Sequence, residues 1–227
     1  MYSDDDIVLA ENNYQPKNSP QAAMHQFQEL RNGYVGIPKR GLLDEELSRN
    51  LVHGYYASVT YMDVLIGKLV DTLDELGLRD NTTIILWGDH GFFLGEHGLW
   101  CKHSSFYEAI RVPLIVSSPN MKKNVKTNSM AELVDVYPTL CEIANIDPPK
   151  YLDGVSLVPI LKDPYVKLKN EIYTRYQRHE AIVDENYSYT EFVNLNPDDK
   201  IPDGEPGMAD MLFDTVSYTH LTLPTKA

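Results

Sequence analysis

Cysteine is scarce in this chain of 227 residues, which contains only Cys101 and Cys141. The two lie in different sequence contexts and form no CxxC spacing. The sequence therefore indicates neither a disulfide framework nor a zinc site. We expect both thiols to be reduced.

Long apolar runs are also lacking, and the first residues show no leader-like pattern. The longest apolar runs, at 83–87 and 112–116, are far shorter than the roughly 20 helical residues that cross a bilayer. Residues 1–6 contain neither a basic stretch nor an apolar one, so we expect no secretory signal at this end. A chain that begins in the middle of a domain would show the same lack.

Basic residues are few compared with acidic ones. The chain has 20 Lys and Arg against 33 Asp and Glu, a formal net charge of -13. Nucleic acids and anionic membranes are recognised through extended basic surfaces, so we expect neither as a partner. A small anionic substrate is compatible with this charge, because it needs only a few cations gathered in a cleft.

The composition that is present is typical of a globular protein. Hydrophobic residues make up 43% of the chain, which is enough to fill a core. A composition with 23% charged and 10% aromatic residues is typical neither of a disordered tail nor of a fibrous repeat.

The N-terminal third divides into a loop-rich part and a helix. Residues 1–41 are rich in Pro, Gly and Asn, and we expect one short helix there, at 22–30. At 43–76, apolar residues recur every three or four positions, and Gly77 follows. This pattern predicts one long amphipathic helix.

Two apolar runs, 84–87 and 112–117, predict strands covered on both faces, as in a parallel α/β sheet. The segment between them, of about two dozen residues, is rich in Gly, His and aromatic residues and has no helical or strand period. Loops of this length inside a compact domain are usually functional. Ligands of open α/β sheets gather at the carboxyl ends of strands, so we expect a site directly after Trp87.

The C-terminal half changes character along its length. A helix is predicted at 131–146, and a short one follows the turn at 152–157. Beyond these, Tyr-rich runs predict a small antiparallel sheet, with strands at 172–176, 181–183 and 187–193. Residues 216–227 match no period, and we interpret them as a tail outside the fold.

Asp89 and His90, at the end of the first predicted strand, both offer lone pairs to a cation. Asp supplies hard oxygen suited to Ca²⁺ or Mg²⁺, whereas His is a less usual ligand for these ions. Calcium takes six or more donors, so the remaining ligands would have to come from elsewhere. Taken alone, such a pair is more often a turn cap and a satisfied polar residue.

Lys102 follows a dozen positions later. A lysine fixed in a cleft holds an anionic oxygen and stabilises charge on a leaving group, although a lone lysine is more often a solvated surface charge. His97 and His103 are candidate proton donors, because the reference pKa of His is about 6.5. A lone His is more often a simple hydrogen-bonding residue, and Glu96 is a candidate to orient His97.

Together, the run from Gly88 to Lys102 (GDHGFFLGEHGLWCK) and the run at 106–116 resemble the second half of the sulfatase catalytic domain. The similarity is closest to the iduronate-2-sulfatase type. Further segments agree in order, at 55–59, 133–140 and 152–157. The resemblance extends from the start of the chain to Asp214.

The resemblance implies an α/β fold, an alkaline-phosphatase-like mixed sheet sandwiched by helices, of which the chain holds the C-terminal part. A small C-terminal antiparallel sheet follows. Residues 1–163 are then the C-terminal part of the sulfatase catalytic domain, 164–214 a small α+β subdomain, and 215–227 a non-native tail.

The resemblance also assigns roles to residues. Asp89 and His90 fall on two of the family's calcium ligands, and Lys102 falls on the lysine that contacts the sulfate ester. His97 joins Lys102 as a candidate catalytic residue. The implied substrate-binding residues are Lys102, His103 and Phe92.

The family's nucleophile is a formylglycine made from Cys or Ser in a C/S-x-P/A-x-R motif, and its hydrate attacks sulfur. Neither Cys101 nor Cys141 begins this motif. We therefore expect a C-terminal fragment, inactive alone, of an enzyme whose nucleophile lies in an absent N-terminal half.

The resemblance implies that the complete enzyme removes sulfate from a sulfated saccharide or another sulfate ester. Calcium would polarise a sulfate oxygen, and Lys102 would neutralise developing charge. The implied location is periplasmic, secreted or lysosomal. Two alternatives stay open: a phosphoester hydrolase of the same superfamily, and a non-catalytic fragment or binding module.

Overall fold

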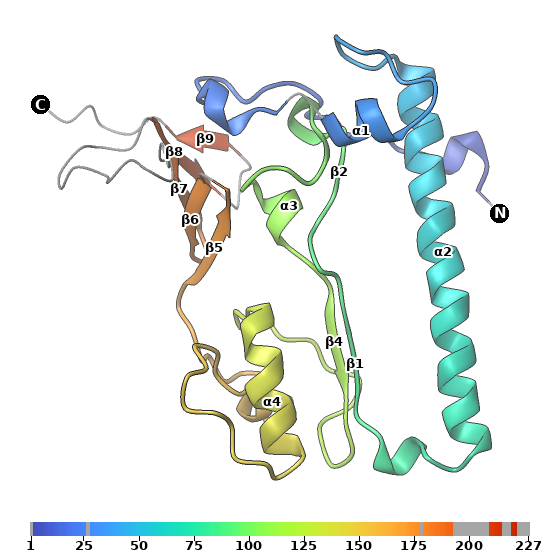
Figure 1. Ribbon diagram of the computed structural model, residues 1–227, viewed down its shortest axis with the longest axis vertical. Helices are drawn as coiled ribbons and strands as arrows, with labels where there is room; N and C mark the ends of the chain where they lie inside the picture. The colour runs from blue at the N-terminus through green and yellow to red at the C-terminus, as the bar shows by residue number, and fades with distance from the viewer. Residues whose placement is uncertain (1, 26–27, 178, 193–208, 215–218, 222–227) are drawn as a thin grey trace, which may run out of the picture. The chain divides into compact units, whose positions relative to one another are not determined.

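The computed structural model describes residues 2–25, 28–177, 179–192, 209–214 and 219–221 (Figure 1). The described residues form two compact units. The first comprises residues 1–82 and 88–113, and the second comprises 83–87 and the described residues from 114 onward. The boundaries expected at residues 163 and 214 stay predictions.

The first unit contains the long helix α2, Glu45–Glu75. Asp44 caps its N-terminus by accepting a hydrogen bond from the Leu47 N–H at 2.8 Å. After the helix, Gly77 adopts a φ of +66°, a left-handed conformation that glycine enters without steric cost. The long helix predicted at 43–76 is confirmed.

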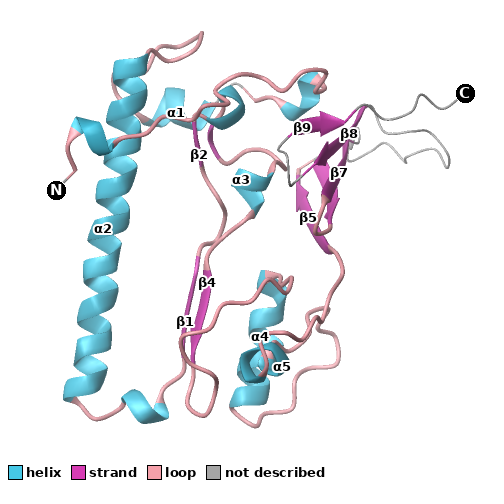
Figure 2. Cartoon of the chain, turned by 180° about the vertical axis from the view of Figure 1, so that it is seen from behind, coloured by secondary structure: helices cyan, strands magenta, loops and turns pink. Residues whose placement is uncertain are grey.

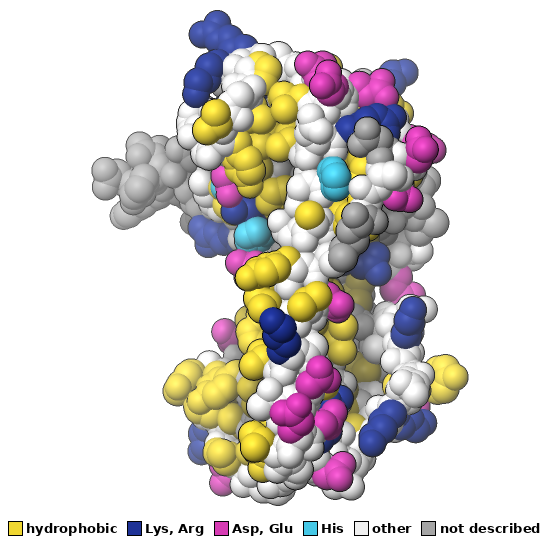
Figure 3. Space-filling view, turned by 90° about the vertical axis from the view of Figure 1, so that its right-hand side faces the viewer, with side chains coloured by type: hydrophobic (Ala, Val, Ile, Leu, Met, Phe, Trp, Pro, Cys, Tyr) yellow, Lys and Arg dark blue, Asp and Glu magenta, His cyan; other side chains and the backbone are white. Residues whose placement is uncertain are grey.

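None of the residues in the apolar stripe of α2 is buried in the described chain, and about half of them are exposed. Val52 is the helix's buried residue, whereas Leu69 is 69% exposed and Val59 is 54% exposed. Figure 3 shows apolar side chains lying between charged ones on the face that contains this helix. The periodicity therefore predicted the helix correctly but did not predict a buried face.

The helix expected at 22–30 is divided in the structure. A 3-10 turn forms at Gln21–Ala23, and α1 forms at Gln28–Gly33. The other short elements of the first unit are η1 (Asp4–Asp6), η3 (Arg79–Asn81), β2 (Phe93–Leu94), η4 (Glu96–Gly98), β3 (Trp100–Cys101) and α3 (Tyr107–Ile110). The most deeply buried apolar side chains here include Phe93, Leu99 and Phe106.

The predicted strands at 84–87 and 112–117 form β1 (Ile84–Trp87) and β4 (Leu114–Ser117) (Figure 2). They pair with each other antiparallel, so the expected parallel arrangement is wrong for this pair. The Gly88 N–H donates to the Pro113 carbonyl at 3.2 Å, so the chain leaves and returns at the same end of the ribbon. Coverage of both faces is also not seen, since Trp87 is 46% exposed.

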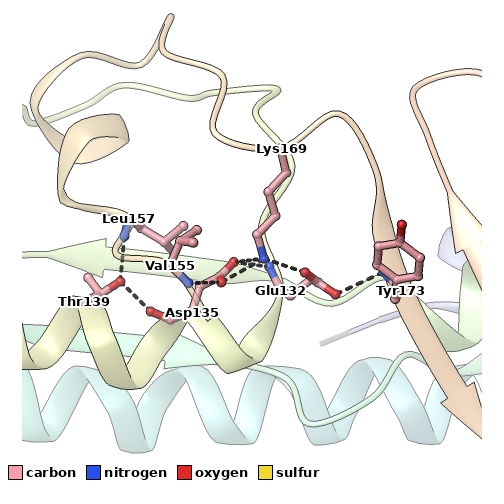
Figure 4. A network of polar contacts seen from close by, with 7 residues as sticks. All are labelled: Glu132, Asp135, Thr139, Val155, Leu157, Lys169 and Tyr173. Atoms are coloured by element: carbon pink, nitrogen blue, oxygen red, sulfur yellow. Dashed lines mark hydrogen bonds and ion pairs between the residues drawn. The ribbon is translucent and has the colours of Figure 1, made fainter. Parts of the chain in front are cut away.

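The second unit contains η5 (Leu133–Asp135), α4 (Val136–Ile143) and α5 (Val158–Lys162), in the region of the predicted helices. A buried polar network joins them (Figure 4). The Asp135 carboxylate is fully buried and accepts from the Val155 N–H and the Lys169 ammonium, each at 2.8 Å. Lys169 also contacts the Glu132 carboxylate. Because every buried charge here has a partner, the network holds this segment together.

The predicted C-terminal sheet is present and is antiparallel throughout. It has five strands in sequential order: β5 (Ile172–Tyr176), β6 (His179–Val183), β7 (Tyr187–Phe192), β8 (Ala209–Asp214) and β9 (Thr219–Leu221). The last strand lies in the segment that we interpret from the sequence as a tail, and its residues Thr219–Leu221 pair with β8. The non-native origin expected for 215–227 stays a prediction. Residue 193, at the end of a predicted strand, and the rest of 216–227 lie outside the described residues. Among the described helices, none combines the length and apolar character needed to cross a membrane.

Candidate functional site

The loop after β1 is held close to α3 by a glycine. The Gly91 N–H donates to the Ala109 carbonyl at 2.8 Å. A Cβ atom at Gly91 would lie 1.9 Å from the Glu108 carbonyl oxygen, far inside van der Waals contact. Glycine is thus required here because two backbone segments touch.

A small hairpin then positions the second half of the loop. Strands β2 and β3 pair Phe93 with Cys101 and Leu94 with Trp100. Trp100 and Cys101 are buried, with 5% and 1% of their surfaces exposed. This buried strand fixes the backbone immediately before Lys102.

Asp89 and His90 lie side by side as the sequence suggested. The Asp89 side chain is 85% exposed and the His90 side chain is 38% exposed, and Oδ2 of Asp89 lies 3.6 Å from Nε2 of His90. Two ligands about 2.4 Å from one ion, at an angle near 100°, are separated by about this distance. The His90 Nδ1 lies 2.9 Å from the Gly91 carbonyl oxygen. If Nδ1 carries the proton, that bond orients the ring and leaves the Nε2 lone pair for an ion.

The donor set at Asp89 and His90 therefore fits part of a divalent-cation site. Among the residues that the structure describes, no group of three or more His, Cys, Asp or Glu is placed to hold a metal ion. The two residues could supply adjacent ligands, and others would have to complete the coordination of Ca²⁺.

The structure joins Lys102 and His103 through Glu29, which the sequence did not indicate. The Lys102 Nζ lies 2.6 Å from Oε1 of Glu29, and the His103 Nε2 lies 2.8 Å from Oε2 of the same carboxylate. Each of the three side chains is between 26% and 35% exposed. The cluster is therefore ordered by direct contacts and still open to a ligand.

Electrostatic interactions keep Glu29 and Lys102 charged. The hydrogen bond from Lys102, which outweighs desolvation, lowers the pKa of Glu29 below its usual value. The same hydrogen bond raises the pKa of Lys102, and the negative charge of Asp89 adds to this increase. Near neutral pH, Lys102 is thus an ammonium group within electrostatic reach of Asp89.

His97 occupies a different environment from Lys102. Its side chain is 2% exposed, its ring stacks on Phe106 at 4.6 Å between centroids, and its Nε2 lies 3.2 Å from a Glu108 carboxylate oxygen. Glu96, expected as an orienting residue, instead accepts from the Leu94 N–H at 2.6 Å. These contacts are those of a core histidine that supports the hairpin.

Phe92 and Cys101 complete the set of residues considered from the sequence. The Phe92 ring lies 5.1 Å from the Tyr55 ring of α2, so it packs against the long helix. Burial raises the pKa of the Cys101 thiol to about 11, and the negative charge of Glu29 acts in the same direction. Cys101 is therefore a protonated structural thiol and a poor nucleophile.

Residues 3–146 match the protein-family model described as Sulfatase. Among curated relatives, iduronate 2-sulfatase of Mus musculus is 30% identical over 180 residues, which cover 66% of this chain and 32% of the relative. The chain spans only 28% to 32% of the length of the first three curated relatives it matches.

Solved structures agree with the fold. BT4656, solved in complex with its substrate D-glucosamine-2-N,6-O-disulfate, has a TM-score of 0.62 and 27% identity, covering 83% of this chain and 38% of its own. The phosphonate monoester hydrolase of Silicibacter pomeroyi has a TM-score of 0.76 and 20% identity, covering 96% and 46% of the two chains. The second similarity shows the fold alone.

Proposed function

This chain belongs to the sulfatase family, and from that premise we propose that the whole protein hydrolyses the sulfate ester of a sulfated saccharide. The expected family and the alkaline-phosphatase-like α/β fold are confirmed by the comparisons. The observation that carries the proposal for this chain is the cluster of Lys102, Glu29 and His103.

Lys102 is the residue proposed to contact the sulfate group. It is charged at neutral pH, partly exposed, and fixed at the end of a buried strand. A fixed ammonium group stabilises negative charge that develops on an ester oxygen as the S–O bond breaks. Glu29 orients Lys102 and His103 and acts as a positioning residue.

Asp89 and His90 are proposed as two ligands of a divalent ion, with Ca²⁺ expected from the family. Such an ion would supply Lewis-acid polarisation of a sulfate oxygen when bound. Asp89 is exposed enough to reach it, and its negative charge also favours the protonated form of Lys102. The Asp89 carboxylate would therefore bind the ion and also stabilise the positive charge of Lys102.

The nucleophile is proposed to come from a formylglycine in a segment outside these 227 residues. Neither cysteine of the chain lies in the motif that would be converted, and Cys101 is buried. The chain by itself is accordingly proposed to be inactive. His97, packed in the core, is assigned a supporting role rather than proton transfer.

The test is to express the whole protein and compare hydrolysis of a sulfate ester with hydrolysis of the matching phosphate monoester and phosphonate monoester. We expect the highest kcat/KM for the sulfate ester. Preference for either phosphorus substrate would replace the proposal with phosphoester chemistry, for which the same fold is also used.

A further inference from the structure

A cavity of about 620 Å³ lies in the first unit, between the segment at 15–42 and the hairpin residues 97–99. This is the size of many small-molecule sites, which span roughly 300–1,000 Å³. Arg31, Lys39 and Arg40 line it, and none of the described lining residues is Asp or Glu. In a chain with a formal charge of -13, this is a local concentration of positive charge.

The wall of the cavity is built by reciprocal hydrogen bonds. The Arg31 guanidinium, 8% exposed, donates to the carbonyls of Pro38 and Gly41. The Lys39 ammonium donates to the Arg31 carbonyl at 2.9 Å. These bonds tie the loop at 38–41 to α1 and so fix the backbone that carries Arg40.

Arg40 is the cationic residue of the cavity lining that can contact a ligand. It is exposed, it lines the cavity, and it makes no hydrogen bond or ion pair with any residue that the structure describes. Its guanidinium offers a planar fork of donors that matches the oxygens of a sulfate or a carboxylate. Arg31 and Lys39, in contrast, already donate hydrogen bonds to backbone carbonyls.

The cavity adjoins the Lys102 cluster through two histidines. His25 lines the cavity, and its ring lies 5.8 Å from the His103 ring at an interplanar angle of 88°. His103 in turn contacts Glu29, which also holds Lys102. His25 and His103 therefore link the lining of the cavity to the Lys102 cluster by direct contacts.

We propose that this cavity binds a second anionic group, a sulfate or a carboxylate, on the same sulfated sugar whose sulfate ester lies at Lys102. Arg40 is its principal ligand, and Arg31 and Lys39 add positive potential. This inference rests on the proposed function and narrows its substrate class to sugars with at least two anionic groups. The cavity thus makes the second anionic group a specificity determinant.

The experiment measures binding to the 227-residue chain by calorimetry. The dianionic probes are glucosamine 2-N,6-O-disulfate and a 2-O-sulfated uronic acid, and the monoanionic probe is glucosamine 6-O-sulfate. Arg40→Gln should weaken the binding of at least one dianionic probe by about tenfold, because it removes a charge-assisted hydrogen bond. The affinity for the monosulfated probe should not change. The control Lys68→Gln removes an exposed charge on α2 outside the cavity and should change nothing.

Three results would overturn the inference: no binding of either dianionic probe by the wild-type chain, no effect of Arg40→Gln, or equal weakening of all probes. A parallel Lys102→Gln variant separates this inference from the proposed function. Weakened binding of the monosulfated probe supports Lys102 as the sulfate ligand. If binding is unaffected by Lys102→Gln but weakened by Arg40→Gln for a dianionic probe, the anion-binding cavity stands and the proposed role of Lys102 fails.

Discussion

Replacing Glu29 by Gln is the perturbation that tests the structure of the site most simply. The substitution keeps the shape of the side chain and removes the charge that holds Lys102 at 2.6 Å and His103 at 2.8 Å. Since these side chains are about a third exposed, solvent screening limits the loss of unfolding free energy to about 1 kcal/mol. The pKa of Lys102 should also fall, because its hydrogen bond with the Glu29 carboxylate raises it.

The pH dependence of this loss follows from the direction of the pKa shifts. The pKa of Glu29 is lowered in the folded chain, so its stabilisation is complete above the unfolded-state pKa and disappears as the pH falls through the folded-state pKa. The pKa of Lys102 is raised, so its share is complete below the unfolded-state pKa and is lost as the pH rises through the higher folded-state value. The full effect is expected between these limits, near neutral pH.

The assay is urea denaturation of wild type and Glu29→Gln at neutral pH and again in acid below the folded-state pKa of Glu29. Glu45→Gln is the control, because Glu45 forms a 2.8 Å pair with Arg49 but its side chain is 71% exposed. Glu29→Gln should be the more destabilising at neutral pH and should lose its effect in acid. An equal loss at both pH values would refute the ion-pair explanation.

Three further predictions concern the structure around the site and the second unit. Asp135→Asn should lower the unfolding free energy by about 3 kcal/mol, because it leaves the nearly buried Lys169 ammonium without its main partner; a loss below about 1 kcal/mol in urea would contradict this. Gly91→Ala should strongly lower the melting temperature, whereas Gly67→Ala, in open space on α2, should not; similar melting temperatures would show that the backbones do not touch. Cys101, whose pKa is raised to about 11, should resist thiol reagents at pH 8 until urea unfolds the chain, and fast labelling of the native chain would contradict its burial.

Local patterns predicted much of the fold. The period of apolar residues and Gly77 together predicted α2, and the Tyr-rich runs predicted strands β5, β6 and β7. These elements are set by neighbouring residues, which a single sequence contains. The direction in which β1 and β4 pair depends on where the chain returns, and an apolar run is the same for either direction.

The candidate site was predicted only where its members are close in the sequence. Asp89 with His90, and Lys102 with His103, stand next to each other in the chain and were identified from their chemistry. Glu29 is far from them in the sequence, in the short helix expected at 22–30, and nothing local marks its contact with Lys102. His97 has the residue type of a proton donor, but only packing reveals that its ring is stacked inside the core.

The measurement that tests the central claim most directly is kcat/KM for a sulfate ester in the whole protein, with and without Lys102→Ala. Loss of a group that stabilises transition-state charge should lower kcat/KM by about 10²–10³-fold. The variant should lose only about 1 kcal/mol of stability, since it breaks one partly exposed ion pair. Unchanged turnover by a folded Lys102→Ala variant would contradict the assignment of this lysine to the sulfate group.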